Sequence, residues 1–176
     1  AWKVRNPESA LLAGMFLGLA AFWNGAAVIG GLLILAGFAL FSDGKLDYLI
    51  TAVTAVAFSV LQTRIFIWGS AVDTTFYWGF LSEDKSLKGV LLYLLQMSGI
   101  YFLGALVLLI FLKKRTERMV LFSCFLPVVF TFTISMTPDI AVNHKYLMIA
   151  YAFLTMFWGL AILKFFRKKI PGRILA

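Results

Sequence analysis

The stretch that decides the fold is LLAGMFLGLAAFWNGAAVIGGLLILAGFALF, at residues 11–41. It is apolar almost throughout, and a single helix of this length would overshoot the roughly 20 residues that cross a bilayer. Asn24 and Gly25 interrupt it near the middle, directly after Phe22 and Trp23. We therefore expect two antiparallel transmembrane helices joined by a tight turn at Asn24.

The rest of the chain has the composition of a membrane protein. Its 176 residues are 62% hydrophobic, and the mean hydropathy is +0.93, as in polytopic helical proteins. The expected fold is all-α, a transmembrane bundle of about six spanning helices that forms one domain over residues 1–176. Because the first residues are polar and do not resemble a signal peptide, we expect this domain to be part of a larger protein. The expected helices cover residues 9–22, 25–42, 46–67, 88–112, 119–137 and 146–166.

The distribution of lysine and arginine predicts the orientation. If both termini are cytoplasmic, 12 of the 16 basic residues fall on the inner side, as the positive-inside rule requires. The outer side keeps Arg64, Lys85, Lys88 and Lys145. We expect a multi-pass integral protein of a prokaryotic plasma membrane, with the inner charges near anionic lipids. The inner basic residues are Lys3, Arg5, Lys45, Lys113, Lys114, Arg115, Arg118, Lys164, Arg167, Lys168, Lys169 and Arg173.

The composition also argues against several classes of protein. The net charge of +8 lies in clusters beside apolar runs, so it predicts contact with membrane lipids and not with nucleic acid. The one cysteine, Cys124, provides neither an intrachain disulfide nor a thiolate metal site. One histidine, His144, excludes a bis-histidine haem held by this chain alone.

The strongest candidate site is TPDIAVNHKY, at residues 137–146. A proline ends one expected helix there, and Asn143, His144 and Lys145 precede the next. The positive end of that helix, together with Lys145, makes a plausible site for a phosphate or another anion. Proline, aspartate and asparagine are also common turn residues, so a purely structural loop remains open.

Arg64 is the second candidate, because it lies near the outer end of the helix expected at 46–67. An arginine at that depth must snorkel, pair with an acid or face water. Asp73, Asp139 or a substrate phosphate are its candidate partners, and the guanidinium group suits bidentate contact with either kind of anion. No regular metal-ligand spacing is present, so no metal site is predicted, although a divalent cation stays open as a cofactor.

Several local patterns predict helix starts and contacts. Asn6 and Pro7 predict the start of the first helix, and the segment 82–86 predicts a cap before the fourth. The carboxylates of this second segment, Glu83 and Asp84, suit a surface role. The loop at 68–87 is rich in aromatic residues and could hold a short interfacial helix. Glycines in the first two helices suit close helix contact, or are simply common in membrane helices.

Four segments resemble GT-C type membrane glycosyltransferases. ALLAGMFLGLAAFWNGA at 10–26 is similar to their short helix pair, and YWGF at 77–80, LLYLLQMSG at 91–99 and VNHKY at 142–146 are similar to parts of their C-terminal membrane half. The resemblance implies a transferase that takes a sugar from a polyprenyl-phosphate donor on the external face. It implies that Arg64, His144 and Lys145 neutralise the donor phosphate beside Asn143, with Asn24 as a secondary contact.

The chain also departs from that family. The family's essential acidic residue lies in a first external loop that has no counterpart here, so Asp73 and Asp139 are only candidate acidic contributors without an assigned role. The catalytic part then belongs to a missing N-terminal portion or another chain, or the activity has been lost. Two alternatives remain open: a non-catalytic membrane subunit of a larger complex and, third, a small transporter.

Overall fold

A computed structural model describes residues 6–66, 75–76, 82–135 and 143–167. The described chain is helical apart from two very short strands. Its elements, in order, are α1 (Pro7–Leu19), a 3-10 turn η1 (Ala20–Phe22), α2 (Gly25–Phe41), α3 (Lys45–Phe66), β1 (Thr75–Phe76), α4 (Leu87–Ser98), α5 (Tyr101–Phe111), α6 (Arg115–Thr133), β2 (Ile134–Ser135) and α7 (His144–Arg167). The expected all-α class is confirmed.

Three of the described helices, α3, α6 and α7, are long and apolar enough to cross a membrane. A fourth span results if α4 and α5 count as one broken segment. Such helices mark the chain as a multi-pass integral membrane protein. Helices α1 and α2 are apolar but shorter, so the count of six spans stays a prediction.

The helix expected at 88–112 is broken, and this part of the sequence analysis is wrong. Helices α4 and α5 meet at an angle of 107°, with Gly99 between them at φ 59° and ψ −138°. Only glycine adopts this backbone conformation readily. The chain therefore turns sharply inside a run that is apolar on both sides of the break. The helix expected at 119–137 also differs, because α6 begins at Arg115 and ends at Thr133.

The predicted helix starts are confirmed. The Asn6 side chain accepts a hydrogen bond from the Ser9 amide at the start of α1. Asn24, predicted as a turn residue, also caps a helix, because it accepts a hydrogen bond from the Ala26 amide at the start of α2. Ser86 does the same for α4 by accepting from Gly89 N. Each bond satisfies an amide that the helix itself leaves without a partner. The interfacial helix expected at 68–87 falls largely outside the described residues. The described parts before α4, strand β1 and residues 82–86, are not helical.

Helices α1 and α3 pack closely along small residues. Ala10, Gly14 and Gly18 recur every four residues and are buried on α1, where they meet Thr51 and Ala55 of α3. A Cβ atom added at Gly18 would lie 2.6 Å from the carbonyl oxygen of Ala55. The glycines therefore serve an intrachain contact, of the small-residue kind that brings membrane helices together.

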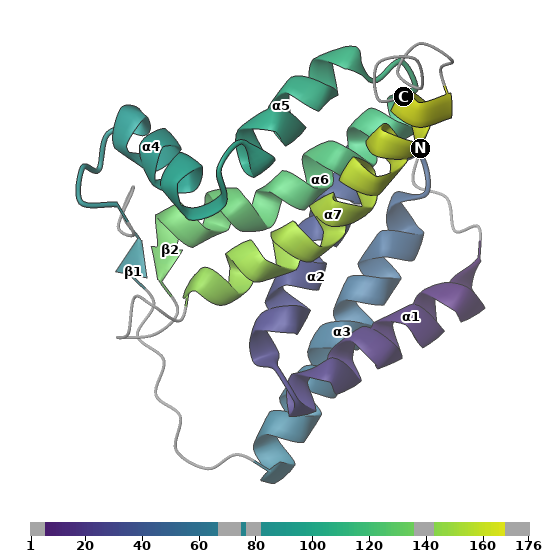
Figure 1. Cartoon of the computed structure of the whole chain (residues 1–176). Helices are drawn as coiled ribbons and strands as arrows, with labels where there is room; N and C mark the ends of the chain where they lie inside the picture. Colours follow the sequence, from purple (N-terminus) through teal and green to yellow (C-terminus); the bar gives the residue numbers. More distant parts are fainter. Residues whose placement is uncertain (1–5, 67–74, 77–81, 136–142, 168–176) are drawn as a thin grey trace.

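Contacts between helices show which way each one runs. Asn6 N donates to Asp47 Oδ1, and Thr51 Oγ1 donates to the carbonyl of Ala10, both with an offset of 41 residues, so α1 and α3 are parallel. Helices α2 and α6 are antiparallel, because Gly37 faces Ser123 whereas Phe41 accepts a hydrogen bond from Arg115. Helices α6 and α7 form an antiparallel pair closed at Asn143 (Figure 1).

The bundle consequently has two ends. We call one the Asn24 end; it carries Asn24, the last turn of α3 and the first turn of α7. We call the other the Arg115 end; it carries the end of α2 and the starts of α3 and α6. Lys45 and Arg115 lie at the Arg115 end, as the predicted distribution of charge requires. Which end faces the cytoplasm stays a prediction.

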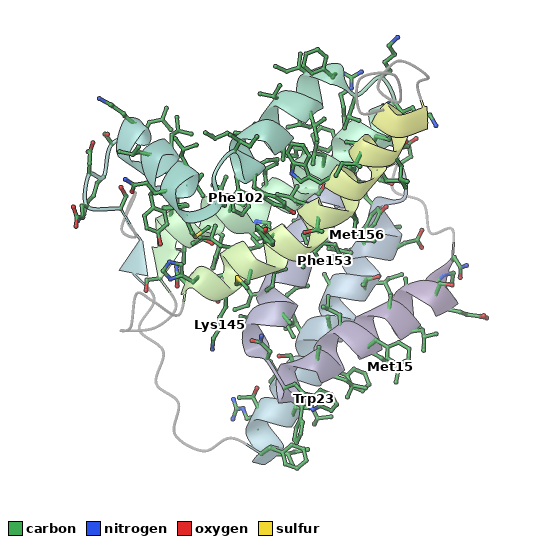
Figure 2. All side chains as sticks on the ribbon, in the orientation of Figure 1. Met15, Trp23, Phe102, Lys145, Phe153 and Met156 are labelled. Atoms are coloured by element: carbon green, nitrogen blue, oxygen red, sulfur yellow. The ribbon has the colours of Figure 1, made fainter. Side chains whose placement is uncertain are left out.

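The apolar core lies between α4, α5, α6 and α7. Phe102 of α5, Phe132 of α6 and Leu147 of α7 are fully buried within it, and Figure 2 shows Phe102 facing α6 and α7. Strands β1 and β2 pair antiparallel, with Thr75 opposite Ser135. This pairing ties the long connection after α3 to the end of α6, close to the first turn of α7.

Candidate anion site at the start of helix α7

Asn143 is the structural centre of the predicted site. Its side chain is fully buried, and its Nδ2 donates hydrogen bonds to the carbonyls of Thr131 at 3.1 Å and Ile134 at 2.6 Å. Thr131 lies in the last turn of α6 and Ile134 directly follows the helix, where a helix leaves acceptors unpaired. Asn143 therefore holds the end of α6 to the start of α7. Its Oδ1 has no hydrogen-bond partner within the described part of the chain.

His144 is the first residue of α7 and is half-buried. Its Nε2 forms a hydrogen bond with the hydroxyl of Tyr93 on α4, and the two rings lie with centroids 6.1 Å apart. The edge of Phe132 packs against Tyr93, which fixes the phenol. The hydrogen bond from α4 holds the imidazole ring of His144 in one orientation.

Tyr93 is a site residue that the sequence analysis missed. It lies three residues after Val90 and one before Leu94, which are both buried on α4. That spacing places the tyrosine beside the core face of a helix, where a hydroxyl needs a hydrogen-bond partner. The pattern was therefore visible, but the partner, 51 residues away in sequence, was not.

Lys145 is exposed, and Figure 2 shows it projecting from the first turn of α7, away from α4. Its ammonium group and the first-turn amides of α7 both favour a negative charge here. Among the three consecutive predicted residues, Asn143 is thus structural, His144 is oriented by Tyr93, and Lys145 is accessible to a ligand.

The other predicted residues lie at the same end of the bundle but have different neighbours. Asn24 caps α2 and is exposed. Arg64 is exposed near the end of α3, where the Phe66 ring contacts Phe22 with centroids 5.6 Å apart. Figure 1 shows the last turn of α3 and the first turn of α7 apart from one another. The structure therefore separates Arg64, on α3, from the three consecutive residues Asn143, His144 and Lys145.

Of the predicted acidic residues, one supports the start of α4 and two lie outside the described residues. Asp73 and Asp139 lie outside the described residues. Asp84 accepts hydrogen bonds from the amide and the hydroxyl of Ser86, at 2.9 and 2.8 Å. These bonds stabilise the carboxylate and hold its pKa below the ordinary value, with the bond from the Ser86 amide as the largest cause. Asp84 thus supports the cap of α4, and Glu83 beside it is exposed.

The polar groups at the start of α7 can bind an anionic ligand. In the parts of the chain that the structure describes, no three His, Cys, Asp or Glu side chains come close enough together to hold a metal ion. The polar groups at the start of α7 are an amide, an imidazole, a phenol and an ammonium group. Such a set can bind a phosphate and contact hydroxyl groups.

Comparisons with known proteins leave the family open. No family model matches the chain, and neither a curated protein nor a solved structure is similar to it.

Proposed function

We propose that the chain is a membrane module that binds a polyprenyl-phosphate sugar donor at the Asn24 end of its bundle, as in GT-C type glycosyltransferases. The observation that carries the proposal is the start of α7, where Lys145 is exposed beside a His144 ring held by Tyr93. The donor phosphate would lie against Lys145 and the first amides of α7. Its tail would lie along the apolar helices, within the membrane.

One further feature supports a sugar-bearing lipid. Arg64 and Asn24 are exposed at the same end of the bundle, where they can contact parts of the donor away from the phosphate. The catalytic acid would come from another portion of the protein or another chain.

Binding to the purified protein tests this proposal. Polyprenyl phosphate, with no sugar attached, would be titrated into the full chain in detergent and into the Lys145→Ala and Arg64→Ala variants. Because Lys145 lies at the start of α7 and Arg64 on another element, Lys145→Ala should weaken binding by roughly tenfold, equal to about 1.4 kcal/mol, and Arg64→Ala by less.

The matched control is Lys113→Ala, which removes an exposed lysine from the Arg115 end. It should bind polyprenyl phosphate like the unmodified protein. Equal partitioning of the lipid into all four proteins would contradict the proposal, because partitioning into detergent does not depend on one lysine.

A second candidate, a non-catalytic subunit of a larger membrane complex, is favoured by the apolar surface of the described helices. Ile110 and Phe111 on α5 are 79% and 73% exposed, and Met148 and Met156 on α7 are also exposed. These faces can contact either lipid or a neighbouring chain. Retention of a stable partner after mild solubilisation, with no saturable binding of polyprenyl phosphate, would favour this function.

A transporter is the third candidate, and one observation bears on it. Transporters commonly contain broken membrane helices near their binding sites, and the chain breaks between α4 and α5 at Gly99. Uptake of a labelled solute into proteoliposomes that are preloaded with the unlabelled solute would test this function, and uptake above that of protein-free liposomes would favour it.

A further inference from the structure

A long apolar groove lies between α2 and α3, far along the chain from the start of α7. Its volume is about 710 Å³. Leu32 and Ala36 line it from α2, and Ala52 and Val56 line it from α3. The small alanine side chains leave room between the two helices, whose other faces pack against α1, α6 and α7.

The groove is open to the surroundings of the bundle. Only 11% of the residues in the most apolar segment of α3 are buried within the protein, and Val56 is 47% exposed. Because α3 is long and apolar enough to cross a membrane, this face lies among lipid chains. An apolar groove that is open to lipid suits a lipid tail better than a water-soluble ligand.

One end of the groove is polar and positively charged. Lys45 and Tyr48, in the first turn of α3, provide the polar groups among its described lining residues. Arg115 lies at the same end of the bundle, where its Nη2 approaches the carbonyl of Phe41 at 3.4 Å. A molecule that fills the groove thus meets a cation at one end and hydrocarbon along the rest.

The length of the groove fits one leaflet. From Lys45 to Ala57 it follows α3 for about 18 Å, at about 1.5 Å per residue. Half of a hydrocarbon core that is roughly 30 Å thick is about 15 Å. An acyl chain whose headgroup lies at Lys45 would therefore run along the groove within its own leaflet.

We propose that this groove binds an anionic glycerophospholipid, with one acyl chain between α2 and α3 and the headgroup phosphate at Lys45. Basic residues beside membrane helices recognise anionic headgroups in this way. The site is distinct from the start of α7, which lies at the opposite end of the bundle. A structural lipid here would hold α2 and α3 together where their own side chains leave a gap.

Native mass spectrometry of the full chain, released from micelles that contain phosphatidylglycerol or phosphatidylcholine with identical acyl chains, tests the proposal. The unmodified protein should prefer phosphatidylglycerol by about fivefold, which corresponds to about 1 kcal/mol for one lysine near an anionic lipid. Lys45→Gln should abolish that preference. Ala52→Phe, which fills the groove, should lower the occupancy of both lipids.

Lys88→Gln is the matched control, since it removes an exposed lysine of α4 that belongs to neither proposed site, and it should leave the preference unchanged. A preference that survives Lys45→Gln would overturn the proposal. So would displacement of phosphatidylglycerol by equimolar polyprenyl phosphate that depends on Lys45, because the groove would then belong to the sugar donor. Failure of polyprenyl phosphate to bind through Lys145 affects only the proposed function.

Discussion

At the scale of single residues, Asn143 shows how a polar side chain can be both buried and necessary. Its two hydrogen bonds satisfy carbonyls at the end of α6 that have no helical partner. Losing these bonds is costly in an apolar environment, because the buried carbonyls would have no water molecule to bond with instead.

Asn143→Ala should therefore lower the free energy of unfolding by about 1–3 kcal/mol, since it leaves buried acceptors without donors. Thermal unfolding in detergent measures the change. Lys145→Ala, at the next exposed position along the chain, should stay within about 0.5 kcal/mol of the unmodified protein. Equal stability of the two variants would mean that the end of α6 does not depend on the amide.

Asp84 gives a pH dependence with a definite sign. Its pKa is lowered by Ser86 from an ordinary value of 3.8, so its stabilising effect on the start of α4 is present above that value. The effect is lost as the pH falls through the lower pKa of the folded state. The thermal midpoint of the unmodified protein should exceed that of Asp84→Asn at neutral pH. The difference should shrink as the pH falls below 3.8 and vanish once the pH is below the lowered pKa of the folded state. A difference that grows towards low pH would contradict the assignment.

At the scale of elements, close packing of α1 on α3 depends on the absence of side chains. Gly18→Ala would put a methyl group 2.6 Å from the Ala55 carbonyl oxygen and from Phe58 Cβ. Such overpacking should cost about 1–3 kcal/mol, measured by thermal unfolding. Gly159→Ala is the control within α7, because its added methyl group meets nothing within 4 Å. It should be neutral or stabilising by up to about 1 kcal/mol. A similar loss of stability in both variants would contradict the role of Gly18 in packing.

The break between α4 and α5 shows what an apolar pattern does not reveal. Residues on both sides of Gly99 are largely apolar, and a glycine inside a membrane helix is common. The sequence pattern therefore predicted one continuous helix through Gly99. The positive φ of Gly99 depends on how Leu94 and Phe102 fit the same core, and that fit is a property of the packed structure.

At the scale of the whole molecule, the directions of the helices predict two chemically different ends. Cysteine substitutions at Asn24 and Lys145 should react with a membrane-impermeant maleimide added outside intact cells. Substitutions at Lys45 and Arg115 should react only after permeabilisation. Reversed labelling of all four would invert the predicted orientation and keep the fold, whereas mixed labelling within one end would contradict the fold itself. The native Cys124 is buried, so its background labelling should be low.

Much of this arrangement was predictable because it rests on local chemistry. Asn6 and Ser86 predicted helix starts through the preference of their side chains for free amides, and the basic residues predicted which loops share an end. Contacts between distant elements were not predictable. The bond between Tyr93 and His144 joins residues 51 apart, and nothing near either residue indicates the other.

The parallel pairing of α1 with α3 also has a consequence for the order of synthesis. Because the two helices are offset by 41 residues, the surface of α1 that carries Gly14 and Gly18 is made well before the residues that cover it. Until synthesis has reached Ala55, this glycine-lined face of α1 must contact lipid or the insertion machinery instead of α3. The first part of the bundle is therefore completed only when its third helix arrives, and α1 waits for α3 across the intervening α2.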